Sequence, residues 1–267
     1  MGGPIGCDWS RGESGAQVSN QPGEVQPEKA RIMNRCFAAC LQQIIRGFRA
    51  QFFVEKSPEK LTLDLPGDRG FSFDIVGRLR SNDFDGEVWI EGKAYTAASD
   101  LLQHYRQFVR RVALARLYQK RVKNDRFWFI SSAPFGCAEG SEVGTQSWMR
   151  KTIRNPKSAT SFGEVVISPE EVESIEQSGY EDLARSAHAL ILTPELMRTT
   201  KLRQFPEDGD SIWSLTKYLY NGRVPEEFGR YSQSVSAVNQ LSSPDFIKVG
   251  EPLELPFLEG LIDGRDR

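Results

Sequence analysis

Two short runs decide the fold, residues 71–77 (FSFDIVG) and residues 88–94 (VWIEGKA). Each is apolar enough to form a buried β-strand, yet each carries ionisable residues in its middle. These are Asp74 in the first run and Glu91 and Lys93 in the second. Because successive side chains of a strand point in opposite directions, Glu91 and Lys93 are expected on one face.

Pairing of these two predicted strands brings their ionisable groups together. The alternation puts Asp74 on the face opposite three apolar residues, Phe71, Phe73 and Ile75. On its own face Asp74 then meets Glu91 and Lys93, which share the face of Trp89. Two carboxylates and a lysine are the groups needed to hold a hard divalent cation and to activate water beside it.

The composition is that of an ordinary globular protein. The chain has 267 residues, of which 39% are hydrophobic and 26% charged, and its net charge of −2 excludes a uniformly basic nucleic-acid binder. No apolar run is long enough for a transmembrane helix, so no membrane association is expected. Residues 1–27, rich in Gly, Ser, Gln and Pro, predict a flexible tail without a signal peptide, and hence a cytoplasmic protein.

The cysteines point to the same compartment. Cys36 and Cys40 are four residues apart, and the chain contains no Cys-x-x-Cys motif. This spacing favours reduced thiols in a cytosolic protein, with a disulfide or a zinc site as the alternatives.

Hydrophobic periodicity predicts an α/β fold. The expected elements are a helix over 28–52, strands over 60–65, 70–79 and 87–94, a helix over 96–120 and a strand over 127–131. Three closely spaced strands suggest an antiparallel meander, and the helix that follows allows the last strand to pair in parallel. The result is a mixed central β-sheet flanked by helices.

Weaker patterns follow residue 135. They predict helices over 143–153, 169–177, 194–204 and 210–220, and strands over 164–168 and 187–192. We therefore expect one domain over 28–267, with a core over about 28–132 and a C-terminal elaboration over about 133–267.

The order of these elements, with Asp74 on one strand and Glu91-Gly92-Lys93 on the next, resembles the PD-(D/E)xK nuclease superfamily. The resemblance covers residues 28–132 and implies a restriction-endonuclease-like core. It implies that Asp74 and Glu91 bind Mg²⁺ (or Mn²⁺) and that Lys93 orients or polarises the attacking water. The carbonyl oxygen of Ile90 is a further candidate ligand.

Two features extend or depart from that pattern. Gln103 and Gln107, one helical turn apart, resemble polar helix positions that some branches place beside the site. Several branches also carry a glutamate on the first helix, where this chain has Gln42 and Gln43, with Glu28 only at the start of the predicted helix.

The resemblance implies a Mg²⁺-dependent phosphodiesterase, a nuclease that hydrolyses DNA in restriction, phage defence or DNA repair. It also allows a homodimer or a partner protein. One alternative is a module on the same fold that binds nucleic acid or protein without turnover. Another is a different α/β fold in which the Glu-x-Lys pair arises by chance.

A run of positive charge follows the predicted site. Between residues 106 and 126 Asp125 is the only acid, among many Arg and Lys residues. Candidate nucleic-acid contacts are Arg78, Arg106, Arg110 and Arg111. The alternative is a solvated helix face whose cations favour the helix C-terminus.

Several of these residues also allow a second interpretation. Asp74, Glu91 and Lys93 could form an exposed surface ion pair, or Asp83 or Asp85 could replace Asp74. His104 is either a helix-surface residue or a phosphate contact. Aromatic residues of the C-terminal third are predicted to be core, and a base-stacking platform is their second interpretation: Trp213, Tyr218 and Tyr220.

Overall fold

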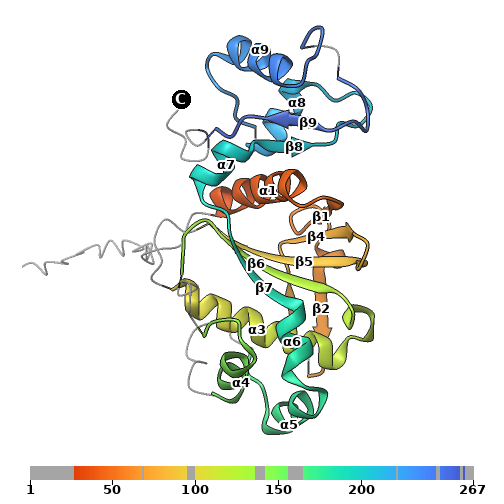
Figure 1. Cartoon of the computed structure of the whole chain (residues 1–267), viewed down its shortest axis with the longest axis vertical. Helices are drawn as coiled ribbons and strands as arrows, with labels where there is room; N and C mark the ends of the chain where they lie inside the picture. The colour runs from red at the N-terminus through yellow and green to blue at the C-terminus, as the bar shows by residue number, and fades with distance from the viewer. Residues whose placement is uncertain are drawn as a thin grey trace, which may run out of the picture.

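A mixed five-stranded sheet forms the centre of the molecule (Figure 1). The computed structural model describes residues 27–67, 69–94, 100–135, 142–155, 165–220, 222–244, 247–258 and 261. Along the sheet the strands are β1 (Phe48–Phe53), β4 (Ile75–Arg80), β5 (Asp85–Lys93), β6 (Arg126–Ser131) and β7 (Ala187–Ile191). The pairs β1–β4 and β4–β5 are antiparallel, whereas β5–β6 and β6–β7 are parallel. The predicted mixed sheet is confirmed.

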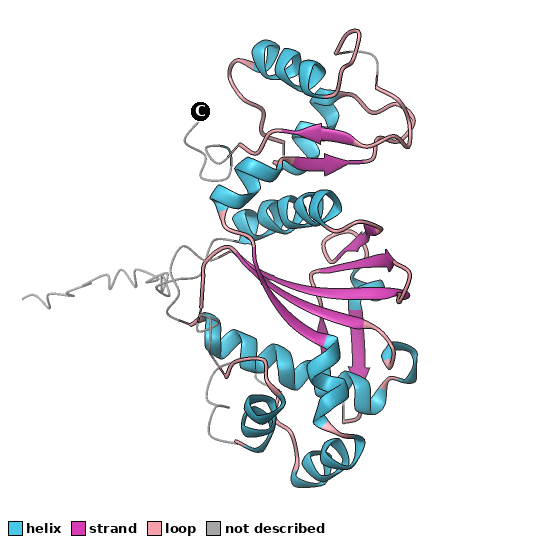
Figure 2. Cartoon of the chain, in the orientation of Figure 1, coloured by secondary structure: helices cyan, strands magenta, loops and turns pink. Residues whose placement is uncertain are grey.

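Helices cover both faces of this sheet (Figure 2). One face packs against α1 (Pro27–Ile44), and beyond α1 lie α7 (Pro194–Thr200), α8 (Ile212–Leu219), α9 (Phe228–Val238) and a small sheet of β8 (Leu202–Gln204) and β9 (Leu253–Leu255). The other face packs against α3 (Leu101–Tyr118), which is joined by α4 (Gln146–Arg154), α5 (Pro169–Ser178) and α6 (Tyr180–Ser186). Shorter elements are α2 (Pro58–Leu61), β2 (Thr62–Leu65), β3 (Arg69–Ser72) and the 3₁₀-helix η1 (Lys120–Val122). None of the described helices combines the length and apolar character needed to cross a bilayer.

The first helix is shorter than its periodicity predicts. Helix α1 ends at Ile44, and the chain turns at Gly47, whose φ of +85° favours glycine. An ideal Cβ on Gly47 would lie 2.0 Å from the carbonyl oxygen of Arg80, so the turn is also sterically closed to other residues. The segment predicted to end the helix is instead β1, which becomes the first strand of the sheet.

The predicted strand over 70–79 is divided in two. Strand β3 pairs with β2 in a separate two-stranded sheet, and β4 pairs with β1 and β5. The peptide N–H of Phe73 donates to Leu61, whereas that of Asp74 donates to Ile90 at 2.9 Å. The break therefore lies between these two residues. As a result Phe71 and Phe73 pack on the α3 side and Ile75 on the α1 side, and their predicted common face is wrong.

The C-terminal patterns are partly confirmed. Ser168 caps α5 in a capping box with Glu171. The helix predicted over 143–153 forms as α4, three residues later at its start and one at its end, and α8 lies within the predicted 210–220. Residues 165–168 form no strand, and the helix predicted over 194–204 ends at Thr200 because Lys201 adopts a φ of +61°. Strand β7 matches the prediction over 187–192.

The described cysteines form no disulfide. Cys36 and Cys40 are buried and free, and burial raises the pKa of the Cys36 thiol well above its usual range. The remaining two cysteines, Cys7 and Cys137, lie outside the described residues, as does the predicted tail apart from Pro27.

Candidate active site

The predicted residues Asp74, Glu91 and Lys93 converge at the point where β3 and β4 separate into different sheets. Strand β4 begins opposite Ile90, with the pair Ile75–Ile90, so Asp74 faces Glu91 one step further along. Since the chain leaves the sheet before Asp74, the peptide N–H of Gly92 has no strand partner on that side. It donates to Oδ2 of Asp74 at 2.8 Å. The separation of β3 from β4 thus leaves the Gly92 N–H free to position the Asp74 carboxylate.

The second carboxylate is held by two cations. Glu91 is only 6% exposed, and its Oε1 lies 2.8 Å from Nζ of Lys93 and 3.3 Å from a guanidinium nitrogen of Arg111. Lys93 follows on the same face of β5, whereas Arg111 reaches over from α3. The alternative of an exposed surface pair is excluded for Glu91. Arg111, predicted to contact nucleic acid, instead completes this buried network.

The charges shift the pKa values of these groups in different directions. Burial and the nearby charge of Glu91 raise the pKa of Asp74 to about 7, against the effects of Lys93, the Gly92 N–H and Arg111. Burial acts to raise the pKa of Glu91, but Lys93 and Arg111 outweigh it and hold the pKa below its usual value. Burial acts to lower the pKa of Lys93, but the two carboxylates outweigh it and raise the pKa. Lys93 is therefore a firmly protonated ammonium in the metal-free site.

One face of α3 contributes to the network of charged side chains around Glu91. Gln103, Gln107 and Arg111 recur every four residues and so share a face of the helix. His104, on the same helix, is half-buried, so the predicted choice between a helix-surface residue and a phosphate contact stays open. This stripe places Gln107, which is buried, one turn from the arginine that binds Glu91.

The other side of Gly92 is closed by α1. An ideal Cβ at Gly92 would lie 1.9 Å from Oδ1 of Asn34 and 3.4 Å from Cδ2 of Phe37. Asn34 is buried, and its Oδ1 has no hydrogen-bond partner among the described residues. The residues at which this chain departs from the first-helix glutamate of the family have other partners: Gln42 bonds to Ala50 and Arg203, Gln43 bonds to Glu254, and Glu28 pairs with Arg223. Sequence reasoning missed Asn34 because only the packing of α1 on β5 identifies it.

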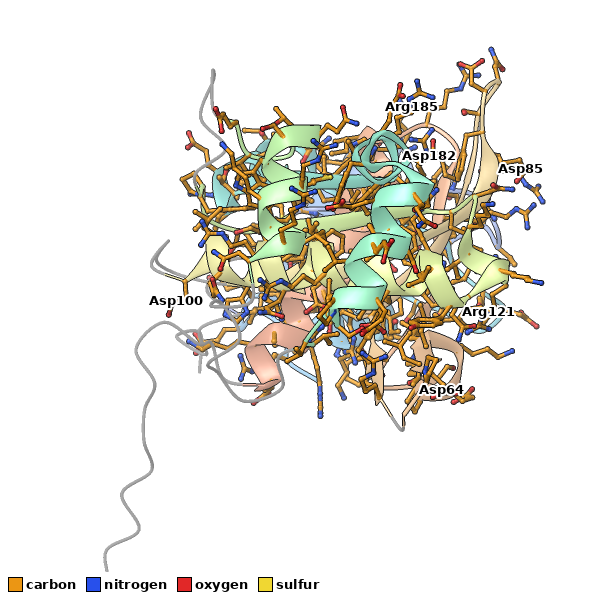
Figure 3. The ribbon with its side chains drawn as sticks, turned by 90° about the horizontal axis from the view of Figure 1, so that it is seen from below. Asp64, Asp85, Asp100, Arg121, Asp182 and Arg185 are labelled. Carbon is orange, nitrogen blue, oxygen red and sulfur yellow. The ribbon has the colours of Figure 1, made fainter. Side chains whose placement is uncertain are left out.

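The acids proposed as replacements for Asp74 lie away from the site. Asp85, at the far end of β5, is exposed and pairs with Arg78 at 2.8 Å. Figure 3 shows Asp85 and Asp100, which precedes α3, at opposite margins of the molecule. Arg78 is four residues from Asp74 along the strand, about 13 Å at the usual rise, and does not join the site.

The basic run is only partly available to a ligand. Arg110 is 3% exposed, and its guanidinium donates to the carbonyl oxygens of Thr152 and Asn155 at the end of α4. This structural role removes Arg110 from the predicted nucleic-acid surface. Arg106 is half-buried and lines a small cavity of about 120 Å³ beside α4.

The donor set fits one hydrated divalent ion better than a full protein cage. Within the described residues no group of three or more His, Cys, Asp or Glu side chains is arranged to hold a metal. Asp74 and Glu91 each keep one carboxylate oxygen, Oδ1 and Oε2, without a hydrogen bond in the described part of the chain. Mg²⁺ commonly uses one or two carboxylates and several waters. The carbonyl of Ile90 already accepts the Asp74 N–H, so a metal role would use its second lone pair.

Searches against protein-family models, curated proteins and solved structures found no match. The chemical assignment of the site therefore depends on its geometry and charge.

A pH dependence of stability follows from Asp74. Its pKa is about 7 in the folded protein against 3.8 ordinarily, so the folded state retains a proton that the unfolded chain loses. The stabilisation is fully present below the unfolded pKa and is lost as the pH rises through the folded one. In Asp74→Asn this loss is removed, and between pH 5 and pH 8 the wild type is expected to lose roughly 2 kcal/mol more than the variant. Urea unfolding of both proteins at pH 5 and pH 8 measures the difference. An equal change in the free energy of unfolding of the two proteins between these pH values contradicts the prediction.

Proposed function

We propose that this protein is a divalent-metal-dependent nuclease that hydrolyses phosphodiester bonds in DNA. The observation that carries the proposal is the convergence of Asp74, Glu91 and Lys93 at the start of β4, where β3 and β4 separate. Burial of a carboxylate beside an ammonium and a guanidinium is energetically demanding, which favours a chemical role over an incidental ion pair. Restriction, phage defence or DNA repair are the settings that suit such an enzyme.

The side chains divide the work as follows. Asp74 and Glu91 are the carboxylates that would hold the ion, and Arg111 keeps the Glu91 carboxylate in place. Bound Mg²⁺ or Mn²⁺ supplies the positive charge that acidifies water and offsets charge on the phosphate. Lys93 places its ammonium group beside this position, where it orients the attacking water and stabilises the negative charge of the transition state. Because Asp74 holds a proton near neutrality, metal loading is expected to release it.

One observation favours a second function, a nucleic-acid or protein-binding module without turnover. Asp74 and Glu91 are balanced by Lys93 and Arg111, so the cluster is electrically compensated without a metal. Loss of one partner from such a compensated buried network destabilises a fold whether or not the protein cleaves a substrate, so the network can be kept without catalysis.

Cleavage assays distinguish the two functions. The full chain is incubated with supercoiled plasmid, linear duplex, single-stranded DNA and single-stranded RNA, each with Mg²⁺, Mn²⁺ or EDTA. We expect cutting of DNA that requires a divalent ion and is absent in EDTA. Binding without cutting under all conditions supports the second function, and the RNA arm tests the choice of DNA.

A further inference from the structure

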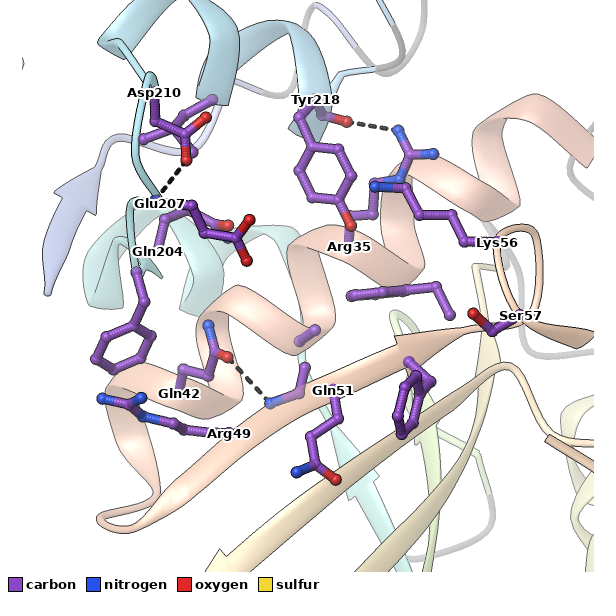
Figure 4. A pocket seen from close by; sticks show the side chains of 16 residues that line it. Arg35, Gln42, Arg49, Gln51, Lys56, Ser57, Gln204, Glu207, Asp210 and Tyr218 are labelled. Atoms are coloured by element: carbon purple, nitrogen blue, oxygen red, sulfur yellow. Dashed lines mark hydrogen bonds between the residues drawn. The ribbon is translucent and has the colours of Figure 1, made fainter. Parts of the chain in front are cut away.

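A second polar cavity lies at the edge of the sheet, on the α1 side. It has a volume of about 480 Å³ and is bounded by α1, β1, α8 and the segment after β8 (Figure 4). Its principal lining side chains are Arg49, Gln51, Lys56, Phe205, Glu207 and Tyr218. The volume is within the range of small-molecule sites, about 300–1,000 Å³.

Two cations in this cavity are bound by rings rather than by acids. The guanidinium of Arg49 stacks on Phe205 at 4.0 Å from the ring centroid, and Nζ of Lys56 lies 4.1 Å from that of Tyr218. Neither forms an ion pair with any carboxylate in the described part of the chain. Arg35, by contrast, is held at 3.0 Å by Glu55. The cavity therefore offers two positive groups to an anionic ligand.

Two carboxylates, Glu207 and Asp210, and the amide of Gln51 also belong to the lining. Figure 4 shows Glu207 between Arg49 and Lys56 in this view, with Gln51 at the lower edge of the cavity. Phosphate groups suit the cations, whereas a carboxylate and an amide suit the N–H and C=O groups on the edge of a planar base. A guanidinium stacked on a ring also presents a flat second face, on which bases stack.

An extended peptide fits this edge less well. The peptide N–H of Ala50 in β1 donates to Oε1 of Gln42 at 3.0 Å, and the Gln42 amide donates to Arg203 at 2.8 Å. A side chain thus already satisfies a donor that an added strand would need.

From this arrangement we propose that the cavity binds a nucleotide, with its phosphate on Lys56 or Arg49 and its base against the stacked Arg49–Phe205 pair. The nucleotide is either free or one unit of a nucleic-acid strand. A strand is one of the two sources because the cavity is near the candidate active site: Val54, which follows β1, donates its N–H to the carbonyl oxygen of Asp74 at 3.0 Å. Binding at this cavity does not depend on the proposed cleavage.

The test is a titration of the full-length chain in EDTA, which prevents cleavage. Calorimetry with purine and pyrimidine nucleoside mono- and triphosphates, and with a short single-stranded oligonucleotide, measures binding to wild type, Lys56→Gln, Arg49→Gln and Gln51→Glu. Gln51 is exposed, so its substitution adds a repelling charge with little effect on packing. Lys217→Gln is the matched control, since Lys217 makes the same contact with Trp213, at 3.9 Å, outside the cavity.

We expect the binding measured for the wild type to weaken at least tenfold in the three cavity variants and to remain unchanged in Lys217→Gln. Thermal melting confirms that each variant is folded. If free nucleotides bind and the cavity variants weaken this binding, the ligand is a free nucleotide. If the oligonucleotide alone binds and the cavity variants weaken its binding, the nucleotide is one unit of a strand. No binding of either up to millimolar concentration, or binding that the cavity substitutions leave unchanged, overturns the proposal.

Discussion

Replacing Lys93 with methionine is expected to lower the rate of metal-dependent DNA cleavage by at least about a hundredfold. Methionine retains much of the lysine side chain's length and apolar stem but has no charge. The ammonium group that lies 2.8 Å from Oε1 of Glu91 is then lost, and with it the stabilisation of transition-state charge that the proposed function assigns to Lys93. Initial rates of plasmid nicking at saturating Mg²⁺ measure the effect.

The control must separate chemistry from folding and metal binding. Glu91 keeps its contact with Arg111 at 3.3 Å in Lys93→Met, so one cation remains beside the buried carboxylate. Lys123→Met removes an exposed cation of the same basic run outside the site and is expected to cut at the wild-type rate. Thermal stabilisation by Mg²⁺ should persist in Lys93→Met because both carboxylates remain. A Lys93→Met protein that cuts like wild type contradicts the assigned role.

Substitution of Gly92 by alanine is expected to destabilise the fold by about 2–3 kcal/mol. The new Cβ would lie 1.9 Å from Oδ1 and 3.0 Å from Cγ of the buried Asn34, so the Asn34 side chain or the packing of α1 on β5 would have to shift. The same movement displaces the Gly92 N–H that binds Asp74, so metal-dependent cleavage should fall as well. Urea unfolding monitored by tryptophan fluorescence measures the change in stability.

A second substitution tests whether this contact is the cause. Gly92→Ala combined with Asn34→Ala removes the opposing amide and should recover most of the lost stability. Gly229→Ala is the matched control: it lies in α9, an ideal Cβ there meets nothing within 4 Å, and the change should be neutral or slightly stabilising. If Asn34→Ala does not rescue Gly92→Ala, the close approach is not what excludes a side chain.

The two proposed sites both adjoin the end of β1. The Asp74 backbone bonds to Val54 there, and Lys56 enters the second cavity two residues later. A nucleic-acid strand held by both sites would explain why the chain places cations without acidic partners so near its buried carboxylates. The EDTA titration and the cleavage assay report on the two sites separately.

Several features of the site could be predicted from short-range pattern alone. The alternation of a strand places Glu91 and Lys93 together, and a helical repeat of four places Gln103, Gln107 and Arg111 on one face. The aromatic prediction is only partly confirmed: Tyr220 is buried, but Trp213 is 47% exposed.

The predictions failed where two distant segments compete for the same residues. Arg110 and Arg111 are neighbours in the basic run, yet Arg110 binds the end of α4 and Arg111 binds Glu91. Phe48 continues the four-residue repeat of α1, yet it lies in β1, since the turn at Gly47 depends on the position of Arg80. Neither choice is visible in local periodicity.

The sequence by itself determined an α/β chain, the strand and helix that carry the ionisable residues, and the shared face of Glu91 and Lys93, because periodicity depends only on bond geometry. Only the tertiary structure decided that the predicted strand over 70–79 is interrupted between Phe73 and Asp74, that Asn34 approaches Gly92, and that Arg111 binds Glu91. The physical reason is that a buried charge is stable only with a partner, and the partners of these carboxylates come from segments whose approach depends on the packing of the whole sheet.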